Sequence, residues 1–168
     1  MKIINLKENP KQKVPVDFTG KVIHKNGTVC YFKNGAFHRL DGPAIERPDG
    51  TKEYWVNGKL HRLDGPACEW FNGYKDYYVE GKRHRLDGPA YEGTNGTKIY
   101  FIEGKKHRLD GPACEWFDGT KEYWIDGKYY YKEDFDKLVN EMNKSKTTTC
   151  NNKVVEIEGK KYKLVEMC

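Results

Sequence analysis

The sequence predicts an all-β fold: an elongated, single-layer array of antiparallel β-hairpins, followed by a short C-terminal helix and a terminal hairpin. The main evidence is an internal repeat, because the heptapeptide His-Arg-Leu-Asp-Gly-Pro-Ala occurs four times with a period of 23 residues. A fixed period of this length is typical of proteins whose units stack on their neighbours. The composition agrees, since 37 % hydrophobic residues is low for a globular chain while 14 % aromatic residues is high for a disordered one.

The repeat divides the chain into three parts. Residues 1–37 are predicted to form an N-terminal arm and a degenerate first repeat, residues 38–129 four full repeats, and residues 130–168 a C-terminal cap of helix and hairpin. In the degenerate repeat, Phe18-Thr19-Gly20 and Asn26-Gly27-Thr28 resemble the later turns.

Each full unit is predicted to form a hairpin around a three-residue loop. In the first unit Pro48-Asp49-Gly50 suits a type I turn that ends in a glycine at positive φ. This loop length places Glu46 opposite Lys52, a favourable cross-strand charge pair. The same arithmetic pairs Glu69 with Lys75, Glu92 with Lys98, and Glu115 with Lys121.

The outgoing strand, 51–57 in the first unit, carries two adjacent aromatic residues and leads into a second turn at Asn57-Gly58. Successive strand residues point to opposite faces, so we expect one aromatic row to pack inward and the other to be partly exposed. An exposed aromatic row is a candidate binding surface. We call the row after the tyrosines the aromatic stripe: Trp55, Tyr78, Phe101 and Trp124.

The repeat ends before Tyr130, and the remaining chain predicts a helix and a hairpin. Apolar residues from Phe135 to Met142 recur at helical spacing, which predicts a helix over 133–143 that caps the open sheet edge. Residues 144–152 are expected to be a polar linker. The last hairpin is expected over 154–165, around Glu158-Gly159, with Val155, Ile157, Tyr162 and Leu164 on one face.

Charge, hydropathy and cysteine content limit the classes of partner and the cellular location expected for the chain. The arm carries seven lysines against Glu8 and Asp17, whereas the repeats hold fifteen basic and sixteen acidic residues, so nucleic acid is an unlikely partner. The chain has no apolar run long enough to enter a membrane and no recognisable signal peptide, which predicts a cytoplasmic protein. Five widely spaced cysteines are expected to be free thiols: Cys30, Cys68, Cys114, Cys150 and Cys168.

Residues 18–129 resemble MORN repeats, which are arrays of successive β-hairpins. The resemblance rests on the 23-residue period, the Tyr-aromatic-x-Asn-Gly-Lys segment and the second glycine turn, while the Asp-Gly-Pro turn departs from the usual pattern. The heptapeptide variant is similar to repeats in uncharacterised viral, phage and bacterial proteins. The resemblance implies an elongated interaction scaffold rather than a catalyst.

The heptapeptide itself has two interpretations. In the structural one, Asp41 and its equivalents accept backbone donors, Gly42 supplies an unusual φ, and Pro43 sets the entry of the next strand. In the functional one, a ladder of guanidinium groups binds anions, unless each arginine pairs with an aspartate of its own or the neighbouring turn. We call these residues the arginine ladder: Arg39, Arg62, Arg85 and Arg108.

Catalysis and metal binding are not expected. Equivalent histidines should lie about 10 Å apart, too far to share a zinc ion. A catalyst also needs one asymmetric constellation, so no cofactor and no enzymatic activity is predicted, and an enzyme would require one indispensable residue among His38, His61, His84 and His107.

The third unit departs from its neighbours. Trp70 and Trp116 stand in the second and fourth units where the third has Gly93, which predicts a notch between two tryptophans.

We therefore expect a non-enzymatic binding protein that binds another protein through the aromatic stripe and the arginine ladder. The viral resemblance favours the inhibition of a host protein. The alternative is a protein that sequesters a small anionic, nucleotide-like ligand near Gly93 and Arg85. Uncapped sheet edges offer a route to a homodimer.

Overall fold

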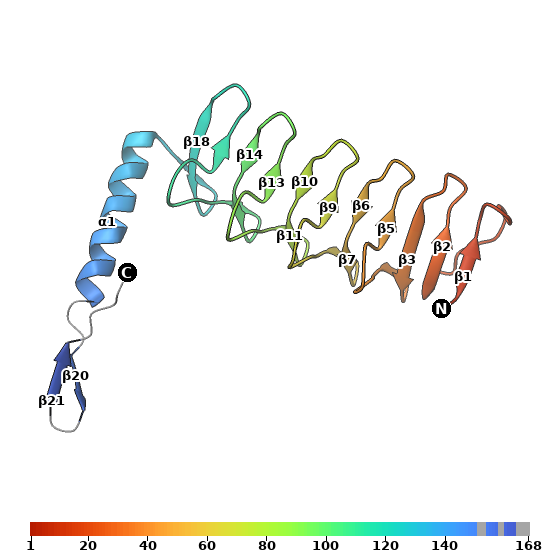
Figure 1. Cartoon of the computed structure of the whole chain (residues 1–168), viewed down its shortest axis with the longest axis horizontal. Coiled ribbons are helices and arrows are strands. Elements are labelled where there is room, and N and C mark those ends of the chain that lie inside the picture. Colours follow the sequence, from red (N-terminus) through yellow and green to blue (C-terminus); the bar gives the residue numbers. More distant parts are fainter. Residues whose placement is uncertain (151–153, 158–159, 164–168) are drawn as a thin grey trace. The chain divides into compact units, whose positions relative to one another are not determined.

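The computed structural model describes residues 1–150, 154–157 and 160–163 and divides into two compact units, Met1–Lys128 and Tyr129–Cys168. The predicted all-β hairpin array with a short helix is confirmed. In the first unit, one sheet runs through all the repeats and forms the ladder of hairpins drawn in Figure 1. Its repeat strands follow in chain order: β5 (Ile45–Glu46), β6 (Lys52–Glu53), β9 (Cys68–Glu69), β10 (Lys75–Asp76), β13 (Tyr91–Glu92), β14 (Lys98–Ile99), β17 (Cys114–Glu115) and β18 (Lys121–Ile125).

The predicted hairpin register is confirmed in all four units. Glu46 lies opposite Lys52, and the three later glutamate–lysine pairs have the same register. Neighbouring units continue the pattern, because Lys52 also lies opposite Glu69 of the next unit. Each such lysine in the first three units therefore stands between two glutamates, which favours this register both within and between units.

We call the hairpins whose strands belong to the continuous sheet the ladder hairpins. Their turn, seen in the first unit, is also as predicted. The backbone N–H of Arg47 donates to Thr51 O at 2.9 Å, which closes the three-residue loop. Asp49 accepts the N–H of Thr51 through its side chain at 2.8 Å, and Gly50 has a φ of 93°. Aspartate and glycine thus hold the positions that this turn requires.

The prediction of one continuous strand over 51–57 is wrong. The strand breaks at Tyr54, whose N–H donates to Ala67 O of the next unit at 2.7 Å, while Trp55 and Val56 pair back onto the segment after the Asn57-Gly58 turn. The positive φ of Asn57 and Gly58, 50° and 74°, closes this two-residue turn. Only in the fourth unit does one strand, β18, cover the whole segment.

Each of the first three units therefore carries a second hairpin besides its ladder hairpin. In Figure 1 the ladder loops follow the upper edge of the array and the second hairpins the lower edge. The second hairpins are β7 (Trp55–Val56) with β8 (Lys59–Leu60), β11 (Tyr78–Val79) with β12 (Lys82–Arg83), and β15 (Phe101–Ile102) with β16 (Lys105–Lys106).

The core of the array is thin. It is built from small residues at equivalent positions, since Ala44, Ala67, Ala90, Ala113 and Cys114 are fully buried and Cys68 nearly so. Side chains of this size let neighbouring strands and loops approach closely, and the larger aromatic residues lie at the surface of the sheet. The stability of such an array depends on contacts between successive units as well as on those within each unit.

The N-terminal arm contains a strand that the sequence analysis missed. β1 (Ile3–Asn5) pairs in parallel with β2 (Gly20–Ile23), the only parallel pair among the described strands. β2 continues to β3 (Val29–Lys33) and β4 (Ala36–Phe37) of the degenerate repeat. Ile4, Phe18 and Val22 form a small apolar core there, so the arm closes one end of the array.

The second unit begins within β19 (Lys128–Tyr130) and contains α1 (Lys132–Cys150). The helix is longer than predicted, and the expected linker over 144–152 is wrong up to residue 150. No Gly or Pro interrupts this segment, and each added residue extends an existing helix by one hydrogen bond. The last hairpin is confirmed as β20 (Val154–Ile157) paired with β21 (Lys160–Lys163), while its turn at 158–159, Leu164 and Val165 lie outside the described residues.

The helix of the described chain is not apolar enough to cross a bilayer.

Candidate functional site

Each arginine of the arginine ladder is bound within its own unit. Arg62 Nε donates to Asp64 at 2.9 Å, and its Nη1 donates to Pro66 O at 3.3 Å and to Glu69 at 2.6 Å. The guanidinium lies 3.9 Å from the ring centre of Tyr54. The same contacts recur at Arg39, Arg85 and Arg108. The interpretation that each arginine pairs with the aspartate of its own turn is therefore confirmed.

This arrangement has electrostatic consequences for the aspartates. The hydrogen bond from Arg39 holds the pKa of Asp41 below its usual value, and Asp64, Asp87 and Asp110 are lowered by their own arginines in the same way. Three donors of each ladder arginine already have partners inside the unit. Binding of an external anion by the arginine ladder stays a prediction, and such an anion would have to compete with these internal acceptors.

The expected role of Gly42 is wrong. The heptapeptide glycines are absent from the residues with positive φ. A Cβ at Gly42 would instead lie 2.9 Å from the Arg39 guanidinium carbon, and one at Gly65 would lie 3.0 Å from that of Arg62. Glycine is favoured here because a Cβ would displace the guanidinium that packs directly on the loop backbone.

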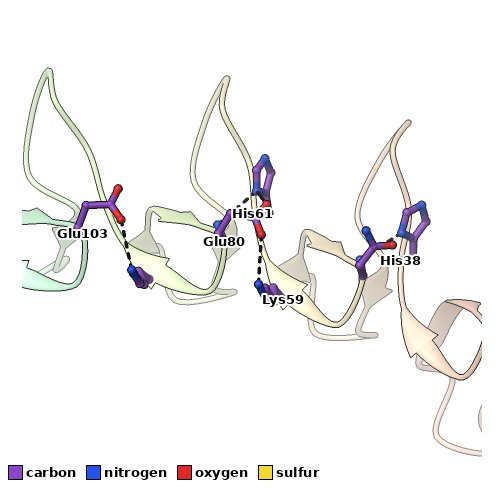
Figure 2. A network of polar contacts seen from close by, with 7 residues as sticks. His38, Lys59, His61, Glu80 and Glu103 are labelled. Carbon is purple, nitrogen blue, oxygen red and sulfur yellow. Dashed lines mark hydrogen bonds and ion pairs between the residues drawn. The ribbon is translucent and has the colours of Figure 1, made fainter.

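The histidines of the heptapeptide hold the turns of the second hairpins. The N–H of Asn57 donates to His38 Nδ1 at 3.1 Å, and that of Glu80 donates to His61 Nδ1 at 3.3 Å. Figure 2 shows these contacts together with the ion pair of Lys59 and Glu80 at 3.3 Å, which joins neighbouring units. Because every unit uses its histidine in the same way, the motif has a structural explanation.

The aromatic stripe lies on the other face of the same segments. Tyr54 packs with the arginine ladder, whereas Trp55 lines a hollow with Phe37, Arg47 and Glu53. The placement of the two aromatic rows on opposite faces is thus confirmed, but the expectation that one row packs inward is wrong, because the tyrosine row is half-buried as well. All four stripe residues, Trp55, Tyr78, Phe101 and Trp124, are half-buried.

A carboxylate row that the sequence analysis missed accompanies the stripe. Trp55 Nε1 donates to Glu53 at 3.0 Å, and Trp124 Nε1 donates to Glu122 at 2.8 Å. The unit with Tyr78 carries Asp76 at this position, and the unit with Phe101, which has no polar group, carries an isoleucine. The signal was present in the sequence, since the residue two places before the stripe changes with the stripe residue.

Cations neutralise this carboxylate row. Glu53 and Asp76 are only 7 % and 6 % exposed, and they pair with Arg47 and Arg83 respectively. Burial raises the pKa of Glu122, but hydrogen bonds from Trp124, Lys106 and Trp116 outweigh this effect and the net shift is downward. Where the third unit lacks a carboxylate, Lys106 reaches the next unit and binds Glu122 at 3.1 Å. No buried side-chain polar atom of the described residues lacks a partner, so the buried polar groups of this face are fully hydrogen-bonded.

The same cations lie over the stripe rings. The Arg83 guanidinium is 5.6 Å from the ring centres of both Tyr78 and Phe101, and Lys106 is 4.5 Å from that of Trp124. Aromatic rings and cations thus alternate along this face. We call this surface the stripe face.

The predicted notch at Gly93 is not an open space. A Cβ there would lie 2.7 Å from Asn95 Oδ1 and 3.3 Å from the ring of Tyr74, which stacks on Tyr91 at 6.0 Å. Side chains of the third unit and its neighbour fill the position. Trp70 is 40 % exposed, and Trp116 Nε1 donates to Glu122 at 2.9 Å, so the two tryptophans have different environments.

Cys30, Cys68 and Cys114 are buried free thiols, as predicted, whereas the side chains of Cys150 and Cys168 lie outside the described ones. Burial raises the pKa of Cys68 to about 12 and those of Cys30 and Cys114 to about 11. In the part of the chain that the structure describes, no three His, Cys, Asp or Glu side chains are grouped in a way that would hold a metal ion.

No protein family model and no curated protein sequence matches this chain.

Proposed function

We propose that this chain is a non-enzymatic interaction scaffold that binds another protein on the stripe face. The observation that carries the proposal is that the backbone is the same in successive units, whereas the side chains of the stripe face vary. Every unit repeats the ladder hairpin and the arginine contacts, while the stripe residue, its carboxylate position and its cation vary among the units.

The chemistry of the stripe face favours a protein partner. Tryptophan, tyrosine and arginine are the residues that most often dominate binding energy at protein interfaces. Here they are half-exposed, and they are held in place by buried carboxylates, so little side-chain freedom is lost on binding.

The resemblance of the heptapeptide units to those of viral and phage proteins supports a host protein as the partner and its inhibition as the outcome. A cytoplasmic location in the host is part of this proposal.

The test is an affinity capture from a host lysate with the tagged full-length chain, compared with a Tyr78→Ala/Phe101→Ala variant. A stoichiometric protein that the wild type retains and this variant loses supports the proposal. The matched control is Phe71→Ala/Phe117→Ala, which removes two exposed aromatic rings from the ladder loops. Equal loss with the control, or retention by the stripe variant, contradicts the proposal.

A second candidate function is the sequestration of a small anionic ligand, and one hollow favours it. A hollow of about 720 Å³ at the N-terminal end of the stripe face is lined by Phe37, Trp55, His24, Lys25 and Arg47. Two aromatic walls and the basic side chains of His24 and Lys25, beside the ion pair of Arg47 and Glu53, suit a planar anion such as a nucleotide.

This candidate is tested by denaturing the purified protein and identifying released small molecules by mass spectrometry. A bound nucleotide that is absent from a His24→Ala/Lys25→Ala variant supports sequestration. These two substitutions leave the ion pair between Arg47 and buried Glu53 intact, so the variant is expected to fold. Absence of any bound ligand, together with no thermal shift on adding ATP, rejects it.

A further inference from the structure

The heptapeptide contains one residue that the fold does not use. The histidine side chain accepts a backbone N–H of a turn, and the arginine side chain donates hydrogen bonds to the loop aspartate and to the proline carbonyl. Glycine leaves space for the guanidinium, and alanine is buried. Leucine is different in the first three units, because Leu40, Leu63 and Leu86 are 79–80 % exposed, whereas Leu109 of the fourth unit is half-buried. An apolar side chain repeated at one exposed position is the signature of an interaction surface.

Three equivalent hollows separate the four heptapeptide leucines. The hollow between Leu40 and Leu63 has a volume of about 530 Å³, the one between Leu63 and Leu86 about 560 Å³, and the one between Leu86 and Leu109 about 470 Å³. Each also contains a tyrosine, a valine or isoleucine, and the arginine and aspartate of two successive loops. We call this row of leucines and hollows the leucine row.

The leucine row presents carboxylates to solvent. The aspartate side chains of the loops are 82–85 % exposed, whereas the arginine side chains that hold them are only 22–23 % exposed. Each aspartate is paired with an arginine, but the carboxylate is the more exposed partner of the pair. A ligand therefore meets apolar groups and carboxylate oxygens before it meets the guanidinium groups, which favours a cationic ligand. The same charge disfavours a second copy, since its leucine row would bring aspartates against aspartates.

The distance between equivalent hollows indicates which backbone conformation a bound peptide would need. Each unit adds two ladder strands, so equivalent hollows lie about 9.6 Å apart. A polyproline II helix repeats every three residues, about 9.3 Å, and presents every third residue on one edge. The heptad of an α-helix is longer, about 10.5 Å, and an extended strand turns every third residue to the opposite face.

We propose that the leucine row binds a basic, proline-rich segment in the polyproline II conformation, with an apolar residue in each hollow and lysine or arginine beside the loop aspartates. The leucine row is a second surface, because its hollows are lined by Tyr54, Tyr77 and Tyr100 and not by the stripe residues. It does not depend on the function proposed for the stripe face.

The test uses a fluorescent peptide of five Pro-Leu-Lys triplets and measures its anisotropy with the full-length protein. We expect saturable binding that weakens with added salt. A Leu63→Ser/Leu86→Ser variant is expected to bind about tenfold more weakly, with unchanged thermal stability because both side chains are exposed. The matched control, Phe71→Ser/Phe117→Ser, should bind as the wild type does.

Two comparison peptides make the result decisive. An acidic peptide of Pro-Leu-Glu triplets should not bind, and a lysine-rich helical peptide with leucine at heptad positions should bind more weakly. Equal or tighter binding of the helical peptide, no binding of the Pro-Leu-Lys peptide, or full binding by the leucine variant would overturn the proposal.

Discussion

Each guanidinium of the arginine ladder joins three parts of its own loop. In the second unit, Arg62 links Asp64, the carbonyl of Pro66 and Glu69, and it covers the ring of Tyr54. Lysine has one point charge in place of this fork and offers neither its geometry nor its planar stacking. The invariance of arginine in the heptapeptide follows from this loop architecture.

We expect Arg62→Ala to lower the free energy of unfolding by about 1–2 kcal/mol, less than for a fully buried network because Asp64 is exposed. Urea unfolding measures this loss. The control is Lys59→Ala, which removes an exposed ion pair with Glu80 in the same region and should cost less than about 0.5 kcal/mol. Equal effects of the two substitutions would contradict the assigned role of Arg62.

The buried thiols predict a dependence of stability on alkaline pH. Because burial raises the pKa of Cys68 to about 12 in the folded chain, its proton is bound more tightly there than in the unfolded chain. The stabilisation is complete below the unfolded thiol pKa of about 8.5 and is lost as the pH rises from there toward 12.

This loss is followed by urea unfolding between pH 8 and pH 11, and we expect a smaller loss for Cys68→Ala than for the wild type. At pH 8, alkylation of Cys68 in the folded chain should also be at least about a thousandfold slower than that of an unfolded thiol. Rapid labelling of the folded protein would show that the thiol is accessible and its pKa normal.

At the scale of the elements, the ladder hairpin and the second hairpin have different roles. The ladder hairpins carry the sheet from unit to unit through paired glutamates and lysines. Each second hairpin begins directly after the strand break. In the first unit its first residue, the stripe residue Trp55, donates a hydrogen bond to the carboxylate row. Asp76 of β10 and Arg83 of β12 connect the two hairpins of the second unit at 2.9 Å.

We expect Arg83→Leu to cost about 2–3 kcal/mol, because Asp76 then stays buried without its cation while Arg83 itself is partly exposed. The double variant Asp76→Ile/Arg83→Leu should recover most of this loss, since Ile99 and Leu60 occupy the equivalent positions in other units. A double-mutant cycle by urea unfolding measures both. A double variant that is as unstable as the single one would contradict the pairing.

At the scale of the whole molecule, the repeats form a nearly one-dimensional object. Units touch their neighbours through the ladder, the lysine–glutamate pairs of the second hairpins and backbone hydrogen bonds such as the one that Tyr54 N–H donates to Ala67 O. Such an array is expected to tolerate the loss of an internal unit, because the new neighbours present the same contacts.

Deletion of residues 61–83 joins Leu60 to His84 and keeps the period. We expect the shortened chain to fold with a similar circular dichroism spectrum, and its urea m-value should fall by roughly a fifth with the surface that is lost. As a control, deletion of twelve residues from the same unit breaks the register and should unfold the array. Failure of the whole-unit deletion to fold would contradict the one-dimensional description.

The sequence alone determined the period, the three-residue turns, the hairpin register and the alternation of two aromatic rows. These features depend on local rules, namely turn chemistry, opposite charges across a pair and the two faces of a strand. The pairing of arginine with aspartate was also within reach, since the two residues lie two positions apart in one loop.

Only the tertiary structure decided where the strand breaks, that Gly42 makes room for a guanidinium, and that Asn95 and Tyr74 fill the position beside Gly93. It also placed β1 beside β2 and buried Asp76 against Arg83. The strand break and the pairing of β1 with β2 depend on segments that are distant in sequence or in the next unit. The contacts at Gly42 and Gly93 depend on the conformations of packed side chains, which sequence spacing does not show. Local pattern cannot determine such contacts, because the free energy that selects them comes from burial and pairing between segments.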